Sequence, residues 1–223
     1  MIPVTAIFFS CRRLALLERT IQGFVNNNTY PIQELIIVND SGDITIYNKL
    51  LAMYPDYTII AHRENVGLVK SIDLGYSHIK TEFFFHCEDD WLITGDGFIE
   101  KGLAIMTGRE DIEEVWLGAY NVHPLDDEIL ETNGVKYRLV KENVCNHTGS
   151  WHGFTMALGL KRMSDYKKVA PYSEVPWVGN IWARECAIGN KYHDLGYRTA
   201  CILEDCAVNI GYGQSEYITG NEK

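Results

Sequence analysis

Residues 82–91 have the sequence EFFFHCEDDW, in which an aromatic run ends in three consecutive carboxylates. The run is short and apolar, as is typical of a strand that is buried on both faces of a sheet. Glu88, Asp89 and Asp90 repel one another, and a chain tolerates that arrangement where a cation neutralises them. Because carboxylate oxygens suit Mg²⁺ and Mn²⁺, the segment predicts a divalent-metal site at the end of a buried strand. The alternative is a solvated acidic turn.

Three similar apolar runs precede this one, at residues 4–10, 34–39 and 57–61. Between the runs, apolar residues recur at helical spacing in segments 12–25, 45–53 and 69–79. Four strands that alternate with helices through short connections predict an α/β fold with a doubly wound, mostly parallel sheet.

Polar residues stand where several of these strands end. Ser10 and Cys11 close the first run, Asn39 and Asp40 close the second, and the acidic triplet 88–90 follows the fourth. Ligands of open parallel sheets bind beyond the carboxyl ends of the strands. We therefore expect these side chains to lie along one edge of a single cleft.

The second half of the chain is less regular. Helices are expected at 98–106 and 176–195, and strands at 114–120, 154–160 and 200–203. The stretch 121–150 is rich in loop-forming residues, and no repeat or domain boundary is visible. We expect a single domain over residues 1–223, made of the halves 1–95 and 96–223.

Composition excludes several classes of protein. The chain has 223 residues, of which 46% are hydrophobic, so it can bury a core and is not a disordered protein. Its formal net charge of −10 argues against a nucleic-acid partner, which would require a basic surface. The six cysteines lack zinc-ligand spacing, and neither a signal peptide nor a transmembrane segment is visible. These features favour a soluble, cytoplasmic protein with reduced thiols, and they leave peripheral attachment to a membrane open.

Four segments, in this order, resemble glycosyltransferase family two. They are FFSCRRLALLERTIQGF (8–24), ELIIVNDSGD (34–43), ENVGLVKSIDLGY (64–76) and FFFHCEDDW (83–91). The resemblance implies the Rossmann-like GT-A fold, with a nucleotide-binding half at 1–95 and an acceptor-binding half at 96–223. It also implies a metal-dependent enzyme that moves a sugar from a nucleotide-diphosphate sugar to the hydroxyl of a glycan or other acceptor, with inversion.

The same resemblance implies residues that hold the nucleotide. Ser10 and Cys11 correspond to positions that line the base, and Asn39 and Asp40 to an acidic pair that contacts uracil and ribose. A UDP-sugar is therefore the favoured donor, with a GDP-sugar as the alternative. Asn39 departs from the acidic residue usual at its position, which could shift the preference for the base.

The acidic triplet has implied roles as well. Asp89 would contact the ribose, and Asp90 would hold Mn²⁺ or Mg²⁺ on the diphosphate. Cys87 replaces the usual leading Asp, so metal ligation would fall to Glu88, Asp89 and Asp90.

Positive side chains near these strand ends could contact the phosphates or the base. Of Arg12, Arg13, Arg63 and Lys70, we favour Arg13 and Arg63, because a guanidinium group can brace a phosphate or stack on a base. Each of them could instead be a solvated helix or loop end.

An inverting transfer also requires a general base. Glu185 lies on the apolar face of the expected helix 176–195, together with Val178 and Trp182, and it stands eleven positions before the pair Gly196-Tyr197, as the family's base does. Glu174 is the second candidate. The structural alternative for Glu185 is an ion pair at the edge of the core.

Two other functions remain open. A sugar-phosphate nucleotidyltransferase would share the sheet, but it usually carries a Gly-rich loop where this chain has Ser10-Cys11-Arg12-Arg13. A non-catalytic protein that binds nucleotide sugars or carbohydrates is compatible with Asn39 and Cys87.

Overall fold

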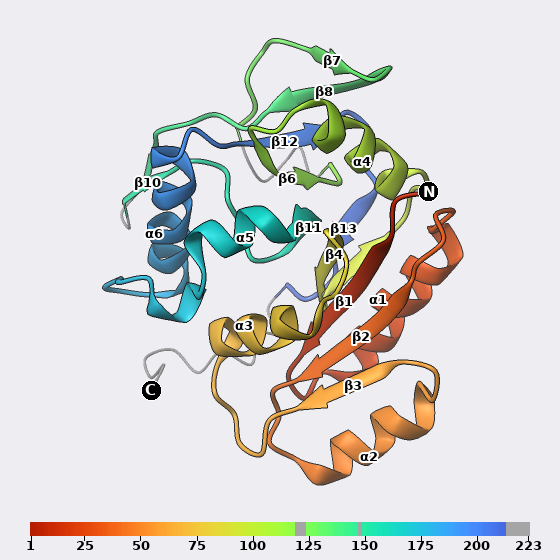
Figure 1. The fold of residues 1–223 in the computed structure, drawn as a ribbon. Coiled ribbons are helices and arrows are strands. Elements are labelled where there is room, and N and C mark those ends of the chain that lie inside the picture. The colour runs from red at the N-terminus through yellow and green to blue at the C-terminus, as the bar shows by residue number, and fades with distance from the viewer. Residues whose placement is uncertain (119–123, 147–148, 213–223) are drawn as a thin grey trace.

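The computed structural model describes residues 1–118, 124–146 and 149–212. Nine strands form one central sheet in the order β3-β2-β1-β4-β11-β6-β12-β8-β7 (Figure 1). Its first part consists of β1 (Val4–Ser10), β2 (Glu34–Asn39), β3 (Thr58–Ala61) and β4 (Phe83–Glu88). These four strands pair in parallel, as the sequence predicts.

Helices connect the parallel strands. They are α1 (Leu14–Asn27), α2 (Ile44–Met53) and α3 (Leu68–His78). The first helix begins two residues later than expected because Arg12 has a φ of 64°, which is incompatible with a right-handed helix.

The alternation of side chains along β1 divides the core into two layers. Phe8 packs with residues of α1 and α4 (Phe98–Gly108) on one face of the sheet. Phe9 packs with residues of α3, α5 (Met163–Val169) and α6 (Ile181–Asp194) on the other face. All seven residues of β1 are buried, which explains why the strand is a continuous apolar run.

The second half extends the sheet with mixed strand directions. Its strands are β11 (Leu158–Arg162), β6 (Ile112–Trp116), β12 (Arg198–Ile202), β8 (Val135–Leu139) and β7 (Leu130–Thr132). Strand β11 is antiparallel to both β4 and β6, whereas β12 is parallel to β6. The sheet is therefore mostly parallel on one side and mixed on the other.

Two small antiparallel two-stranded sheets lie outside the central one. They pair β9 (Val144–Asn146) with β10 (Gly149–Trp151), and β5 (Trp91–Ile93) with β13 (Ala207–Asn209). A 3₁₀ turn, η1 (Tyr172–Glu174), lies between α5 and α6. No helix in the described residues is long and apolar enough to cross a membrane.

Several boundaries in the second half differ from the prediction. The expected strand 154–160 is β11, shifted to 158–162, and the expected strand 114–120 is β6, at 112–116; residues 119–120 lie outside the described residues. The helix expected at 176–195 begins only at Ile181, where the Asn180 side chain accepts a hydrogen bond from the Ala183 amide at 3.2 Å and caps it. The backbone before this cap is not helical.

Candidate functional site

The predicted site residues of the first half, apart from Arg63, lie at or just beyond the carboxyl ends of β1, β2 and β4. The parallel register places Ser10 beside Asn39, and Phe9 beside Glu88. Asp89 and Asp90 follow in the turn between β4 and β5. Parallel pairing thus brings together polar groups that are separated by up to 80 positions in the sequence.

Asp89 is the most enclosed carboxylate of the triplet. Ser10 Oγ donates to its Oδ2 at 2.8 Å, and the guanidinium of Arg13 forms an ion pair with it. Thr20 Oγ1 donates to its backbone carbonyl at 2.9 Å. Burial nevertheless raises the pKa of Asp89 to about 6, because loss of water around the carboxylate outweighs the stabilisation by Arg13 and Ser10.

Asp90 keeps one oxygen free for a ligand. Its Oδ2 pairs with Arg13 Nη1 at 3.1 Å, whereas its Oδ1 is buried and has no hydrogen-bond partner in the described part of the chain. The Ile210 amide donates to the Asp90 carbonyl at 2.7 Å. Gly211 lies against the carboxylate, since a Cβ there would come within 2.3 Å of Asp90 Oδ2.

The donor set of the triplet fits a hard divalent cation. Burial raises the pKa of Glu88 well above its usual range, and the negative charges of Asp90, Asp89 and Glu185 raise it further. Arg13 contributes one positive charge to three carboxylates, so the cluster remains deficient in positive charge. Asp90 Oδ1, which is buried and has no partner among the residues that the structure describes, is an oxygen that such a cation could bind.

Asp40 holds the loop that enters α3. Its Oδ1 accepts from the Val66 amide and its Oδ2 from the Gly67 amide, both at 2.9 Å. Asn65 Nδ2 donates to the Asp40 carbonyl at 2.9 Å and lies 3.3 Å from Cys11 Sγ. Cys11 and Asp40 are therefore joined to one loop, whose turn requires the positive φ of 90° at Gly67.

Asn39 is buried at the end of β2. Its Oδ1 accepts from the Ser41 amide at 3.1 Å, while its Nδ2 has no partner among the described residues. An aspartate here would place two acceptor oxygens in this position, so the amide changes one acceptor into a donor.

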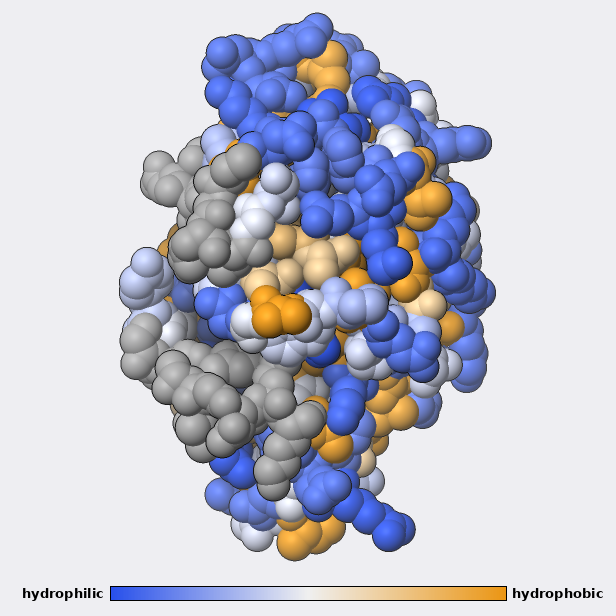
Figure 2. Space-filling model, turned by 90° about the vertical axis from the view of Figure 1, so that its left-hand side faces the viewer, coloured by the Kyte–Doolittle hydropathy of each residue, from blue (hydrophilic) through white to orange (hydrophobic). Residues whose placement is uncertain are grey.

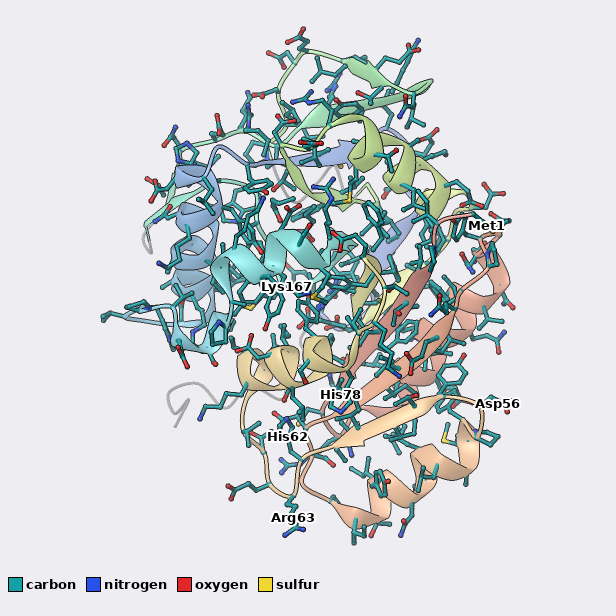
Figure 3. All side chains as sticks on the ribbon, viewed as in Figure 1. Met1, Asp56, His62, Arg63, His78 and Lys167 are labelled. Atoms are coloured by element: carbon teal, nitrogen blue, oxygen red, sulfur yellow. The ribbon has the colours of Figure 1, made fainter. Side chains whose placement is uncertain are left out.

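The structure does not bring Arg63 to the acidic triplet. It lies exposed in the loop after β3, and its side chain points away from the body of the molecule (Figure 3). Of the two favoured cations, Arg13 alone contacts the triplet's carboxylates, through its ion pairs with Asp89 and Asp90.

Glu185 lies on α6 and is only 8% exposed. Its Oε1 accepts from the Met156 amide at 2.8 Å and from Thr155 Oγ1 at 3.2 Å. Burial raises the pKa of Glu185 to about 7. Residues 155–157, which include the hydrogen-bond partners of Glu185, also contact the triplet, because the Glu88 amide donates to the Ala157 carbonyl at 3.1 Å.

The apolar face predicted around Glu185 is partly wrong. Val178 precedes the helix and is 94% exposed, and Trp182 is 57% exposed. The late start of α6 explains the exposure of Val178, because helical spacing cannot be extended back through residues 176–180. Trp182 lies in the first turn of α6 and is exposed on the surface of the helix. The second candidate base, Glu174, lies exposed in η1.

Sequence patterns missed a buried charge network next to Glu185. Glu114 and Lys161 form an ion pair of 2.8 Å with both side chains almost fully buried. Lys161 Nζ donates to the Thr155 carbonyl at 2.8 Å, and the Thr155 amide donates to Glu114 Oε2 at 3.2 Å. The sequence does contain a signal for this network, the pair Glu113-Glu114 inside an apolar strand. Buried charges require partners, so the pair indicates a buried cation nearby.

The chain matches the family model described as Glycosyl transferase family 2 over residues 5–164. No curated protein sequence matches the chain.

Solved structures of glycosyltransferases share its fold. The mannosyltransferase PcManGT from Pyrobaculum calidifontis, in complex with GDP-Man and Mn²⁺, has a TM-score of 0.64 at 15% identity, over 93% of this chain and 56% of that one. GalNAc-T7 with UDP, GalNAc and Mn²⁺ has a TM-score of 0.61 at 9% identity, over 93% and 42%. TarS 1–349 from S. aureus has a TM-score of 0.61 at 11% identity, over 92% and 59%. This chain therefore spans about half the length of these proteins, and the likeness establishes the GT-A fold.

Proposed function

This chain belongs to glycosyl transferase family 2, and we propose that it transfers a sugar from a nucleotide-diphosphate sugar to an acceptor hydroxyl with inversion. The observation that carries the proposal is the acidic triplet at the carboxyl edge of the sheet. There Asp90 pairs with Arg13 through Oδ2 and leaves Oδ1 without a hydrogen-bond partner among the described residues, within the same cluster of charges as Glu185.

Glu88, Asp89 and Asp90 would hold the divalent ion, Mn²⁺ or Mg²⁺. An ion bound there would stabilise negative charge on the departing diphosphate. The Mn²⁺ in the complexes of PcManGT and GalNAc-T7 supports a divalent requirement in this fold. Arg13 adds a second positive charge and already spans Asp89 and Asp90, so it orients the two carboxylates.

The nucleotide would lie against the ends of β1 and β2. Ser10, Cys11, Asn39 and Asp40 gather there, and Asp40 fixes the loop at Val66 and Gly67 rather than standing free. The Asn39 Nδ2 could donate to a carbonyl oxygen of the base, and uracil offers two such oxygens. We favour a UDP-sugar, with a GDP-sugar as the alternative; Arg63 could take part only if its loop moved inward.

Glu185 would be the general base. The acceptor oxygen attacks the anomeric carbon, its proton passes to the Glu185 carboxylate, and the bond between the anomeric carbon and the diphosphate oxygen breaks. A carboxyl group with a pKa of about 7 is well matched to proton abstraction near neutral pH. Because Met156 and Thr155 occupy its Oε1, the other oxygen, Oε2, is the one available to the acceptor.

Release of nucleotide diphosphate from a panel of UDP- and GDP-sugars tests this function. The protein is incubated with Mn²⁺ and each donor, with and without simple glycan acceptors, and the Asp90→Ala variant serves as the control. We expect metal-dependent release from at least one donor by the wild-type protein and none by the variant. Tight binding of a donor with neither hydrolysis nor transfer would instead indicate a non-catalytic nucleotide-sugar-binding protein.

A further inference from the structure

Three potential metal ligands, none of them in the acidic triplet, meet at the last turn of α6. They are Glu142, which follows β8, His152, which follows β10, and His193, in the last turn of α6. Their ligand atoms all lie within 4.8 Å of one another. His193 Nε2 is 3.5 Å from Glu142 Oε1, and the two imidazole rings stack with centroids 3.9 Å apart.

His152 lies buried at the centre of this cluster, with only 8% of its surface exposed. The Asn143 amide donates to its Nδ1 at 3.5 Å, which leaves Nε2 as the nitrogen whose lone pair can bind a metal.

Arg198 supports the carboxylate without filling the cluster. Its Nε lies 3.1 Å from Glu142 Oε1, and its Nη2 pairs with Asp126 at 3.2 Å. The charge of Arg198 is therefore shared between two carboxylates. The ion pair with Arg198 holds the Glu142 carboxylate beside the imidazole of His193.

We propose that Glu142, His152 and His193 form a second metal site, selective for Zn²⁺. Two imidazoles and one carboxylate are a recognised ligand set for zinc, whereas Mg²⁺ and Mn²⁺ prefer oxygen ligands such as the triplet. Zinc bonds of about 2.0–2.1 Å in a tetrahedral site require ligand atoms that are roughly 3.3 Å apart. The ligand atoms lie within 4.8 Å of one another, so metal binding would require side-chain rotations that bring them closer together. Solvent would fill the fourth position.

The proposed ion would join parts of the chain that are distant in sequence. It would tie the β9–β10 hairpin and the segment after β8 to the last turn of α6. The same helix carries Glu185, so zinc would steady the element that presents the proposed base. The side of the molecule that carries α6 is hydrophilic over much of its described surface and has an apolar patch near its centre (Figure 2). An ion would reach the cluster through His193, whose side chain is 36% exposed.

Titration of the untagged, metal-free protein with Zn²⁺ tests the site. The variants are His193→Ala, whose side chain is 36% exposed and whose loss should leave the fold intact, Glu142→Gln, and His152→Ala. His78→Ala is the matched control, because His78 is exposed on α3 and belongs to no such cluster of described residues (Figure 3). Asp90→Asn controls for zinc bound at the triplet.

We expect one Zn²⁺ site whose Kd rises at least tenfold in His193→Ala and in Glu142→Gln but is unchanged in His78→Ala and Asp90→Asn. Co²⁺ in place of Zn²⁺ should give the visible absorption of a tetrahedral site, and His193→Ala should lose it while its circular dichroism stays that of the wild type. Wild-type affinity in both His193→Ala and Glu142→Gln, or loss of the site in Asp90→Asn, would overturn the proposal.

Discussion

The surroundings of Glu185, the proposed general base, set the ionisation of its carboxylate. Enclosure on α6 removes water from the carboxylate, and the two donors at Met156 and Thr155 recover only part of that loss. The resulting pKa of about 7 is well above the ordinary value for glutamate. The proposed base is thus half ionised near neutral pH.

Replacement of Glu185 by Gln should lower kcat by about 10²–10⁴-fold, the usual cost of losing a general base. An amide oxygen can still accept from the Met156 amide, so the fold and the affinity for nucleotide should change little. Steady-state kinetics and calorimetry measure the two quantities. Glu174→Gln, at an exposed glutamate, is the control and should behave as the wild type. Near-full turnover by Glu185→Gln, or a product of retained configuration, would exclude Glu185 as the base of an inverting reaction.

The pH profile follows from the same residue. The base acts in its ionised form, so kcat should rise with pH and level off above about 7, where burial has placed the pKa of Glu185. A profile of kcat between pH 5.5 and 8.5 at saturating metal and donor tests this. A rate that is flat from pH 5.5 upward would indicate either a different base or a step other than chemistry that limits turnover.

Among the elements, the pairing of β5 with β13 determines which residues surround Asp90, one of the proposed metal ligands. It brings Ile210 and Gly211 from the end of the described chain onto Asp90. Gly211 leaves no room for a side chain, because a Cβ there would come within 2.3 Å of Asp90 Oδ2. The close approach holds the carboxylate in place.

Gly211→Ala should therefore displace the Asp90 carboxylate and weaken metal-dependent nucleotide binding by about tenfold or more, a loss of the size seen when groups around a metal ligand are disturbed. Calorimetric titration with UDP in the presence of Mn²⁺ measures the effect. The unfolding midpoint in EDTA should stay close to that of the wild type, which separates a local shift from a general loss of stability. An unchanged affinity for UDP would mean that the backbone around residue 211 shifts to accept the new side chain and leaves Asp90 in place.

The elements differ in how far the sequence predicts them. Strands β1 to β4 and the ends that carry Ser10, Asn39 and Asp90 follow from local patterns, because buried parallel strands are continuous apolar runs. The second half is set by long-range pairing: β11 enters antiparallel between β4 and β6, and no local pattern encodes that position. The partners of Glu185 at 155–156 belong to this part and were missed for the same reason.

Over the whole molecule, acidic charge dominates both the surface and the site. The chain carries a net charge of −10 and also buries carboxyl groups whose pKa values are raised by lack of water, to about 7 at Glu185 and about 8 at Glu113. The folded state therefore holds protons that the unfolded chain releases above about pH 4. The contribution of these two protonated carboxyl groups to the free energy of unfolding is fully present below the pKa of glutamate in the unfolded chain. It is lost as pH rises through their folded-state pKa values of about 7 and 8.

The metal-free protein should consequently be less stable at pH 8 than at pH 6. Thermal unfolding in EDTA at constant ionic strength measures the difference, and Glu185→Gln should show a shallower decline because one of the buried acids has been removed. Since the repulsion among surface charges also grows with pH, both contributions act in the same direction. A midpoint that rises from pH 6 to pH 8 would contradict the burial of these groups as ionisable acids.

The central claim is that the acidic triplet binds a nucleotide diphosphate through a divalent ion, and stabilisation of the whole fold by UDP with and without Mn²⁺ tests it most directly. For the wild type, ligand at a hundred times its Kd should add about 2.7 kcal/mol to the free energy of unfolding when Mn²⁺ is present, and little in EDTA. Asp90→Ala should lose the metal-dependent part, whereas Asp96→Ala, at an exposed carboxylate nearby in the sequence, should keep it. Equal Mn²⁺-dependent stabilisation in the wild type and Asp90→Ala would contradict the account.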